Sequence, residues 1–292
     1  MASVNDSAAI SREAPVLIAG PTASGKSGLA MELAARDGRV VVNADALQVY
    51  GNWRVLTARP TAAEQAALPH ALYGHVARDR VYSVGDWLRD LAPLLAGPVV
   101  IVGGTGLYFQ ALTRGLADIP ATPPAVRAEA DARRQAEGFA ALLAELDAET
   151  AGQIDRQNWM RVQRAWEVLR ATGRGLASWQ RETGAPLLAL ERAEAVQLVP
   201  EVPWLDARIA QRFRAMLGAG ALDEARAELP LWDAGLPSAK AIGAPELIAH
   251  LRGELSLDQA EAAAVLASRQ YAKRQRTWFR SHRAGWRVMA LP

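Results

Sequence analysis

The sequence contains no cysteine among its 292 residues. Disulfide bonds, thiolate metal ligands and cysteine nucleophiles are therefore excluded. No run reaches the roughly 18 apolar residues that a membrane-spanning helix needs, so we expect no membrane partner. The histidines show no zinc-site spacing, and we predict no zinc; they are His70, His75, His250 and His282. The lack of cysteine fits the cytoplasmic location that we expect.

Acidic residues are absent from the end of the chain. The last one is Glu261, and seven Lys or Arg residues follow between Ala262 and Pro292. Because the whole chain carries +2, the first 261 residues carry about −5. A basic end on a mildly acidic body indicates either a polyanion partner or a solvated basic helix.

The first residues, Met1 to Glu13, are polar and include acidic side chains, unlike a signal peptide. We expect them to form a disordered lead-in. The body of the chain is 50% hydrophobic and 22% charged, which is typical of a soluble globular protein with a sizeable core. Nothing in this composition demands more than a monomer.

Short apolar runs alternate with helical patterns in the first part of the chain. The runs are 14–19, 40–42 and 98–102, and helical spacing follows at 29–36 and 107–112. This alternation predicts an α/β fold with a parallel sheet covered by helices. Residues 193–199 are a candidate returning strand, and we expect the remainder to be helical.

Three prolines within 120–124 mark a domain boundary. From there to about residue 179 the pattern is that of amphipathic helices without strands. We therefore predict a core formed by 1–118 plus 189–292, and a helical insertion domain over 119–188.

The first apolar run ends in a phosphate-binding loop of the form G-x-x-x-x-G-K-[ST]. Its residues are Gly20, Pro21, Thr22, Ala23, Ser24, Gly25, Lys26 and Ser27. Glycines let backbone N–H groups surround a phosphate at a helix N-terminus. Lys26 can reach the outer oxygens, and Ser27 can ligate Mg²⁺. The loop does not identify the ligand as ATP, GTP or another pyrophosphate.

A nucleotide hydrolase usually has an aspartate after a second apolar strand, to help hold Mg²⁺. Here the run 98–102 ends in Gly-Gly-Thr-Gly instead. Asp45 does follow a strand. It could serve the metal, cap the segment that begins at Ala46, or act as a base that faces the phosphate.

Several segments together resemble the tRNA dimethylallyltransferases, also called isopentenyl transferases. The phosphate loop is one, and the others are Asn43–Tyr50, Thr57–Pro60, Tyr82–Asp86, Val102–Tyr108 and Ser268–Arg280. The likeness runs in order from Pro15 to Arg280. Its Val-Gly-Gly-Thr-Gly-Leu-Tyr and Ala-Lys-Arg-Gln motifs are the most specific.

The resemblance implies a P-loop kinase-like core and a helical insert that grips the tRNA anticodon stem-loop. It also implies that the loop holds dimethylallyl pyrophosphate with Mg²⁺. The dimethylallyl group would move to the N6 amine of the adenine 3′ of the anticodon. Arg212 matches a family arginine expected near the pyrophosphate.

An aromatic amine is a poor nucleophile, so a carboxylate that takes its proton helps the reaction. Asp45 is our candidate base, and Lys26 would stabilise the leaving pyrophosphate. Thr105 would hydrogen-bond the acceptor adenine, although threonine at that place also suits a helix N-cap.

The resemblance extends to RNA contacts. Those near the acceptor adenine would come from Asp45, Ala46, Leu47, Gln48 and Thr105. More distant ones would come from Arg127, Met160, Arg161, Val162, Gln163, Arg164, Lys240 and Gly243. Arg161 and Arg164 share a helix face and could instead form a solvated surface. Arg269, Lys273, Arg276 and Arg280 form one predicted stripe that could follow phosphates or reach the pyrophosphate.

Some positions depart from the family pattern. Asn158-Trp159-Met160 replaces the usual Asp-Pro-Gln, and Met160 lacks the hydrogen bonds of a glutamine.

Three alternative functions stay open: a small-molecule kinase, a prenyltransferase acting on free adenine nucleotides, and a non-catalytic RNA-binding module.

Overall fold

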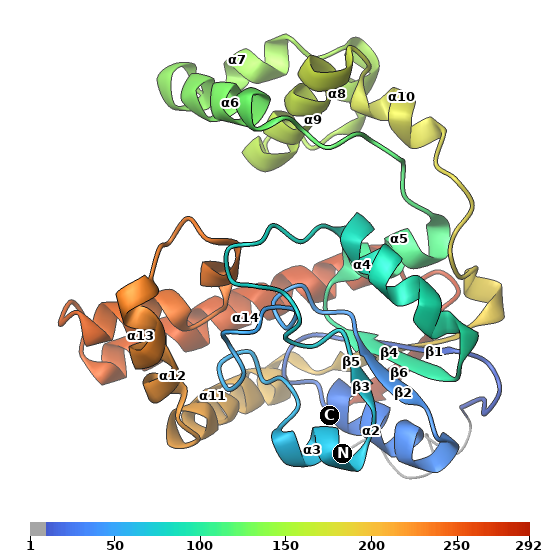
Figure 1. Ribbon diagram of the computed structural model, residues 1–292, viewed down its shortest axis with the longest axis vertical. Helices are drawn as coiled ribbons and strands as arrows, with labels where there is room; N and C mark the ends of the chain where they lie inside the picture. Colours follow the sequence, from blue (N-terminus) through green and yellow to red (C-terminus); the bar gives the residue numbers. More distant parts are fainter. Residues whose placement is uncertain (1–9) are drawn as a thin grey trace. The chain divides into compact units, whose positions relative to one another are not determined.

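A computed structural model describes residues 10–292 of the chain. Six parallel strands form one sheet in the order β3-β2-β4-β1-β5-β6 (Figure 1). The strands are β1 Val16–Ala19, β2 Val40–Asn43, β3 His70–Ala71, β4 Val99–Gly103, β5 Glu194–Pro200 and β6 Arg287–Leu291. The predicted α/β fold with a parallel sheet is confirmed.

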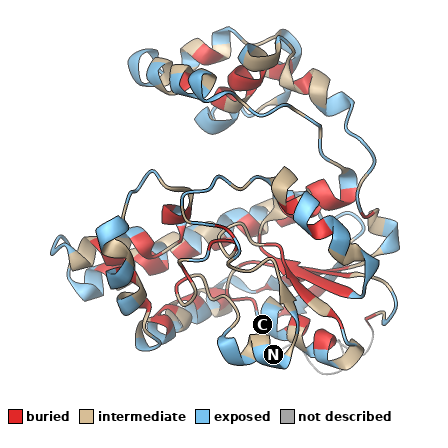
Figure 2. Cartoon of the chain, viewed as in Figure 1, coloured by how far each residue is buried: buried red, intermediate tan, exposed pale blue. Residues whose placement is uncertain are grey.

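Alternate side chains of β1 enter two apolar cores because successive residues of a strand point to opposite faces. Val16 and Ile18 pack with Leu29 and Leu33 of α2 (Lys26–Asp37). Leu17 and Ala19 pack in the core on the other face, which includes Trp87 of α4 (Val84–Leu91) and Phe109 of α5 (Gly106–Arg114). Helices therefore cover both faces, and the central strands are buried (Figure 2).

A third apolar cluster joins the helices that follow β5. They are α11 Val202–Gly218, α12 Ala221–Glu228, α13 Ala244–Leu251 and α14 Leu257–Ser281. Helix α3 of this unit spans Ala62–Ala67. Helix α14 buries the stripe Ala264, Ser268, Ala272, Gln275 and Phe279, which is the periodicity of one helix face.

The chain divides into two compact units, one formed by residues 1–113 with 187–292 and the other by 114–186. The second contains α6 Pro124–Glu137, α7 Phe139–Ala144, α8 Ala148–Gln153, α9 Trp159–Thr172 and α10 Leu176–Arg181. Its own core is built from Ala130, Leu142, Val162 and Trp166. The boundaries at 114 and 186 lie a few residues before those expected from sequence; the first does so because α5 ends at Arg114, before the prolines.

Two sequence expectations fail. The last part is not wholly helical, because Arg287–Leu291 pairs with β5 as the edge strand β6. The expected lead-in ends within the fold: Ile10 is 2% exposed, and the Ser11 amide donates to Glu194 at 2.7 Å. The rest of that lead-in, 1–9, lies outside the described residues. Among residues 10–292, no helix combines the length and apolar character of a transmembrane span.

Arg39 is fully buried beside the sheet and joins segments distant in sequence. It donates to the carbonyl oxygens of Ser11, Ala14 and Val99 at 2.8, 2.7 and 3.2 Å. Its Nε also donates to the carboxylate of Asp37 at 3.0 Å. Hydrogen bonds from Arg36 and then Arg39 hold the pKa of Asp37 below its ordinary value of 3.8.

Arg39→Met should destabilise the fold by about 3–5 kcal/mol, because it leaves three carbonyls without this donor and removes one of the two arginines that hydrogen-bond the Asp37 carboxylate. Asp37 has a lowered pKa when folded, so its stabilising effect is present above pH 3.8 and is lost as the pH falls through the lower folded value. Urea unfolding at neutral and acidic pH measures both effects. A variant as stable as the parent at pH 7 would contradict this role, and Arg36→Met serves as a less buried comparison.

Candidate active site

The phosphate-binding loop joins β1 to α2 through residues 20–25. Gly25 precedes the helix at φ 89°, in the left-handed region that favours glycine. Gly20 sits in a tight place: a Cβ there would lie 2.9 Å from Ser24 Oγ and 3.1 Å from Leu198 Cβ. The loop therefore closes on itself at the N-terminus of α2, where the helix dipole favours an anion.

Lys26 is the first residue of α2, and its Nζ donates to the Pro21 carbonyl at 3.3 Å. Burial lowers the pKa of Lys26 to about 8; the charge of Asp45 raises this pKa and that of Arg212 lowers it. Ser27 follows on the exposed side of the same turn. The cation and the hydroxyl are thus both placed at the loop, as the motif predicts.

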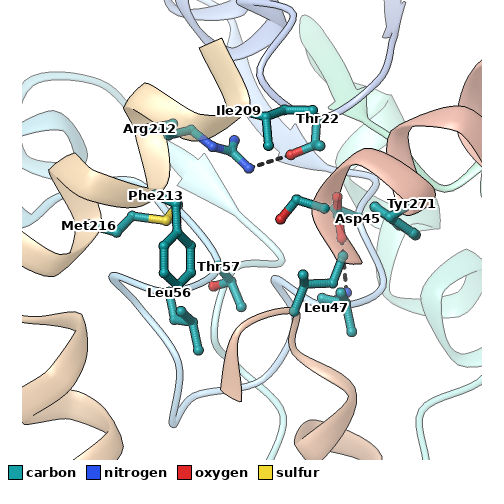
Figure 3. A pocket seen from close by; sticks show the side chains of 12 residues that line it. Thr22, Asp45, Leu47, Leu56, Thr57, Ile209, Arg212, Phe213, Met216 and Tyr271 are labelled. Carbon is teal, nitrogen blue, oxygen red and sulfur yellow. Dashed lines mark hydrogen bonds between the residues drawn. The ribbon is translucent and has the colours of Figure 1, made fainter. Parts of the chain in front are cut away.

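Two arginines of α11 lie against the other side of the loop. Arg208 Nε donates to the Ala23 carbonyl at 3.0 Å, and Arg212 donates to the Thr22 hydroxyl (Figure 3). Burial lowers the pKa of Arg212 to about 10, while the charge of Asp45 acts in the opposite direction. Arg212 still carries its charge at neutral pH, and this clustering of cations favours an anionic ligand.

Asp45 follows β2 and is oriented by its neighbours. The Asn43 side chain bonds both the N–H and the carbonyl of Asp45, at 2.9 and 3.0 Å. Asp45 Oδ1 accepts the Leu47 amide at 3.0 Å. One oxygen therefore fixes a local turn, and no helix starts at Ala46. The carboxylate also acts electrostatically on Lys26 and Arg212, which places it on the phosphate-loop side.

The Gly-Gly-Thr-Gly turn after β4 contains glycines because three neighbours approach closely. A Cβ on Gly103 would lie 2.0 Å from the Ala44 carbonyl oxygen. One on Gly104 would lie 2.0 Å from Gln275 Nε2, and one on Gly106 would lie 2.1 Å from the Trp278 ring. The turn is thus packed directly against α14.

Gln275 connects this turn to the phosphate loop. Its Oε1 accepts the Thr22 amide at 2.8 Å, and its Nε2 donates to the Gly104 carbonyl at 3.0 Å. The residue is 4% exposed. Sequence reasoning assigned Gln275 no role, although it lies in the Ala-Lys-Arg-Gln motif, which was the available signal.

Thr105 connects the same turn to the Asp45 segment. Its hydroxyl accepts the Ala46 amide at 2.9 Å, and its own amide donates to the Ala44 carbonyl at 3.2 Å. Burial and then the charge of Asp45 raise the pKa of Tyr271, and a hydrogen bond with Thr105 acts in the opposite direction. Thr105 therefore hydrogen-bonds the backbone on both sides of Asp45, which holds the two residues side by side.

A cavity of about 510 Å³, including its part open to solvent, lies beside these groups (Figure 3). Its polar lining is Thr22, Asp45, Thr57, Arg212, Ser268 and Tyr271. Its apolar lining is Leu47, Leu56, Ile209, Phe213, Met216 and Ile242. A ligand with a charged end and an apolar end would match both halves.

The other predicted RNA-contacting residues of the core unit differ in their relation to the cavity. Leu47 lines it, whereas the Gln48 side chain donates to the carbonyls of Thr57 and Ala58 at 2.8 and 3.1 Å. Gly243 packs behind Phe213 and Leu56, since its Cβ would lie 2.8 and 2.9 Å from them. Lys240 is exposed at the end of a short 3₁₀ turn.

The predicted RNA-contacting residues of the helical unit divide by exposure. Met160 is 59% exposed, and Arg161 faces solvent beside it. Arg127 and Arg164 both lie 3.9 Å from the buried carboxylate of Glu167.

The Val162 side chain is buried in the unit's core. The Gln163 side chain is 7% exposed and is held by Asp131, Arg134 and Glu167. Those two side chains therefore face inward, because α9 turns that side toward its neighbouring helices.

The four residues of the predicted basic stripe on α14 differ in their exposure and partners; they are Arg269, Lys273, Arg276 and Arg280. Arg269 lies 3.8 Å from the carboxylate of Asp206, while Lys273 and Arg280 face solvent. Arg276 is partly buried, and its Nε has no hydrogen-bond partner among the described residues. The stripe is therefore not one uniform surface.

Comparison with known proteins gives a consistent result. The IPP transferase family model matches residues 48–282, and an isopentenyl transferase model matches residues 14–71. The tRNA dimethylallyltransferase of Cereibacter sphaeroides (strain KD131 / KCTC 12085) is 65% identical over 285 residues, covering 97% of this chain and 91% of that protein.

Solved structures agree. The full-length tRNA isopentenylpyrophosphate transferase of Bacillus halodurans has a TM-score of 0.66 at 32% identity, covering 95% of this chain and 90% of that one. A eukaryotic dimethylallyltransferase, solved acting on tRNA, has a TM-score of 0.80 at 22% identity, covering 94% and 73% of the two chains. The second likeness supports the fold alone.

Gly104→Ala should displace the Gln275 side chain and cost about 1–3 kcal/mol of folding stability through overpacking. It should also weaken binding of inorganic pyrophosphate, because Gln275 would no longer hold the Thr22 amide. Thermal unfolding and titration calorimetry measure the two effects. Gly152→Ala is the matched control, since its Cβ would meet nothing within 4 Å. Unchanged pyrophosphate binding in folded Gly104→Ala would contradict the coupling.

Proposed function

This chain belongs to the tRNA dimethylallyltransferase (IPP transferase) family, and on that premise we propose its reaction and the residues that perform it. It transfers a dimethylallyl group from dimethylallyl pyrophosphate to the N6 amine of the adenine 3′ of the anticodon in tRNA. The observation that carries this assignment is the cavity where Asp45, Arg212 and an apolar wall meet beside the phosphate loop.

The donor fits the two halves of the cavity. Its pyrophosphate binds at the N-terminus of α2, near Lys26, Arg208 and Arg212, where positive charge and the helix dipole combine. Its alkyl chain lies along apolar side chains such as Leu47 and Phe213. In this proposal the bond to be broken lies between the cations and Asp45.

The acceptor adenine enters from the side of Asp45 and Thr105. Asp45 takes the proton of the N6 amine as the amine nitrogen bonds to the allylic carbon. The bond between that carbon and the bridging oxygen breaks, and its electrons leave with pyrophosphate. Lys26 and Arg212 stabilise the negative charge that develops on the leaving group.

The donor set of the chain fits Mg²⁺. This ion prefers oxygen ligands and is usually held by one or two protein groups together with phosphate oxygens. The exposed Ser27 hydroxyl at the start of α2 is such a group. Within residues 10–292 no cluster of three or more His, Cys, Asp or Glu side chains is present, so the pyrophosphate itself would supply the other ligands. When bound, Mg²⁺ would neutralise part of the pyrophosphate charge.

The tRNA contacts that we propose use basic side chains of each unit. Arg127, Arg161 and Arg164 belong to the helical unit, and Lys240 and Lys273 belong to the core unit. Cations of this kind bind the phosphate backbone of nucleic acids. The enzyme would act as a cytoplasmic monomer on the anticodon stem-loop.

The direct test incubates purified protein with Mg²⁺, dimethylallyl pyrophosphate and unmodified tRNA, followed by mass spectrometry of the nucleosides. Isopentenyladenosine should form in the tRNA. Product on free AMP, ADP or ATP alone would favour a nucleotide prenyltransferase, and ATP turnover would favour a kinase. If folded protein forms no product in any of these reactions, the remaining interpretation is a non-catalytic RNA-binding module.

Asp45→Asn tests the base. Asparagine keeps the oxygen that accepts the Leu47 amide, so the local turn should persist. Turnover should fall by about 10²–10⁴-fold, the usual contribution of a general base, while tRNA affinity changes little. Single-turnover rates and filter binding measure the two. Equal losses of rate and binding would reject the base role.

A further inference from the structure

Leu56 and Thr57 line the cavity and belong to residues 53–58, here called the wall segment. Glu224 of α12 accepts three consecutive backbone amides of this segment. The distances are 2.5 Å from Arg54, 3.1 Å from Val55 and 2.9 Å from Leu56. A carboxylate with several amide donors holds its partners more firmly than a neutral acceptor does.

The carbonyl side of the wall segment is held as well. Gln48 Nε2 donates to the carbonyls of Thr57 and Ala58, and the Thr57 hydroxyl donates to the Trp53 carbonyl at 2.6 Å. The buried Trp53 indole donates to the Ser238 carbonyl at 3.0 Å. The segment is therefore fixed through both its amides and its carbonyls.

This fixed backbone presents Leu56 to the apolar half of the cavity, beside Phe213 and apart from Thr22 (Figure 3). Leu56 is 4% exposed and Phe213 is 3% exposed, so both are supported by the core behind them. Both side chains pack against Gly243, where a Cβ would lie 2.8 Å from Phe213 and 2.9 Å from Leu56. The apolar end of the cavity is thus closed by two side chains, Leu56 and Phe213, that belong to the close-packed core.

We propose that the wall segment limits the length of the donor's alkyl chain, with Leu56 as the side chain that sets the limit and Glu224 as the positioning residue that holds it. This inference rests on the proposed function. A dimethylallyl chain fits against Leu56 and Phe213, whereas a donor longer by one isoprene unit collides with them.

Leu56→Ala tests the limit with two donors, dimethylallyl pyrophosphate and geranyl pyrophosphate. The ratio of kcat/KM for geranyl to that for dimethylallyl donor should rise by at least about tenfold, since methylenes in an apolar pocket discriminate by such factors. Leu251→Ala is the matched control: Leu251 packs on the same cluster outside the cavity lining. Its ratio should equal that of the parent.

Glu224→Gln tests the positioning role by removing one charged acceptor while keeping the side-chain shape. KM for dimethylallyl pyrophosphate should rise several-fold, and the donor ratio should shift toward geranyl, with kcat little changed. Loss of kcat for both donors at a constant ratio would show a general folding role and reject positioning.

The outcomes distinguish a failure of the length limit from a failure of the proposed function. If the parent enzyme uses dimethylallyl pyrophosphate but folded Leu56→Ala keeps the parental ratio, the length limit is wrong and the proposed function stands. If the parent uses neither donor, the proposed function fails first. Circular dichroism melts confirm that each variant is folded.

Discussion

The candidate active site depends on one buried side chain, the amide of Gln275. It accepts the Thr22 amide of the phosphate loop and donates to the Gly104 carbonyl of the turn after β4. A buried amide that is satisfied at both ends fixes two backbone segments at once, because leaving either bond unmade is costly. The phosphate loop and the Gly-Gly-Thr-Gly turn are therefore one rigid assembly mounted on α14.

The charges of the site follow from that assembly. Thr105 bonds the Ala46 amide, which fixes Asp45 at the carboxyl end of β2. Arg212 reaches Thr22 from α11, and Lys26 begins α2, so cations surround the phosphate side while the carboxylate faces them. In an open parallel sheet, ligands bind at the carboxyl ends of the strands, and the candidate site lies at that edge.

Much of the site was readable from sequence because it consists of local motifs. The phosphate loop needs glycine at φ 89° and a lysine next to it, and both are encoded within a few residues. Asp45 follows an apolar run directly. Gln275 and Glu224 were not assigned, since their partners lie more than 160 residues away. Strand β6 was missed although Val288–Leu291 is apolar, because an apolar run this short does not by itself distinguish a strand from a helix.

The sequence by itself determined the α/β class, the phosphate loop, the candidate base and the family likeness, because each depends on residue type and short spacing. Tertiary structure alone decided which groups share the cavity. It turned Val162 and Gln163 inward and split the α14 stripe, and it placed Leu56 against Phe213. The physical reason is that burial and long-range hydrogen bonds depend on how distant segments pack, which no local pattern specifies.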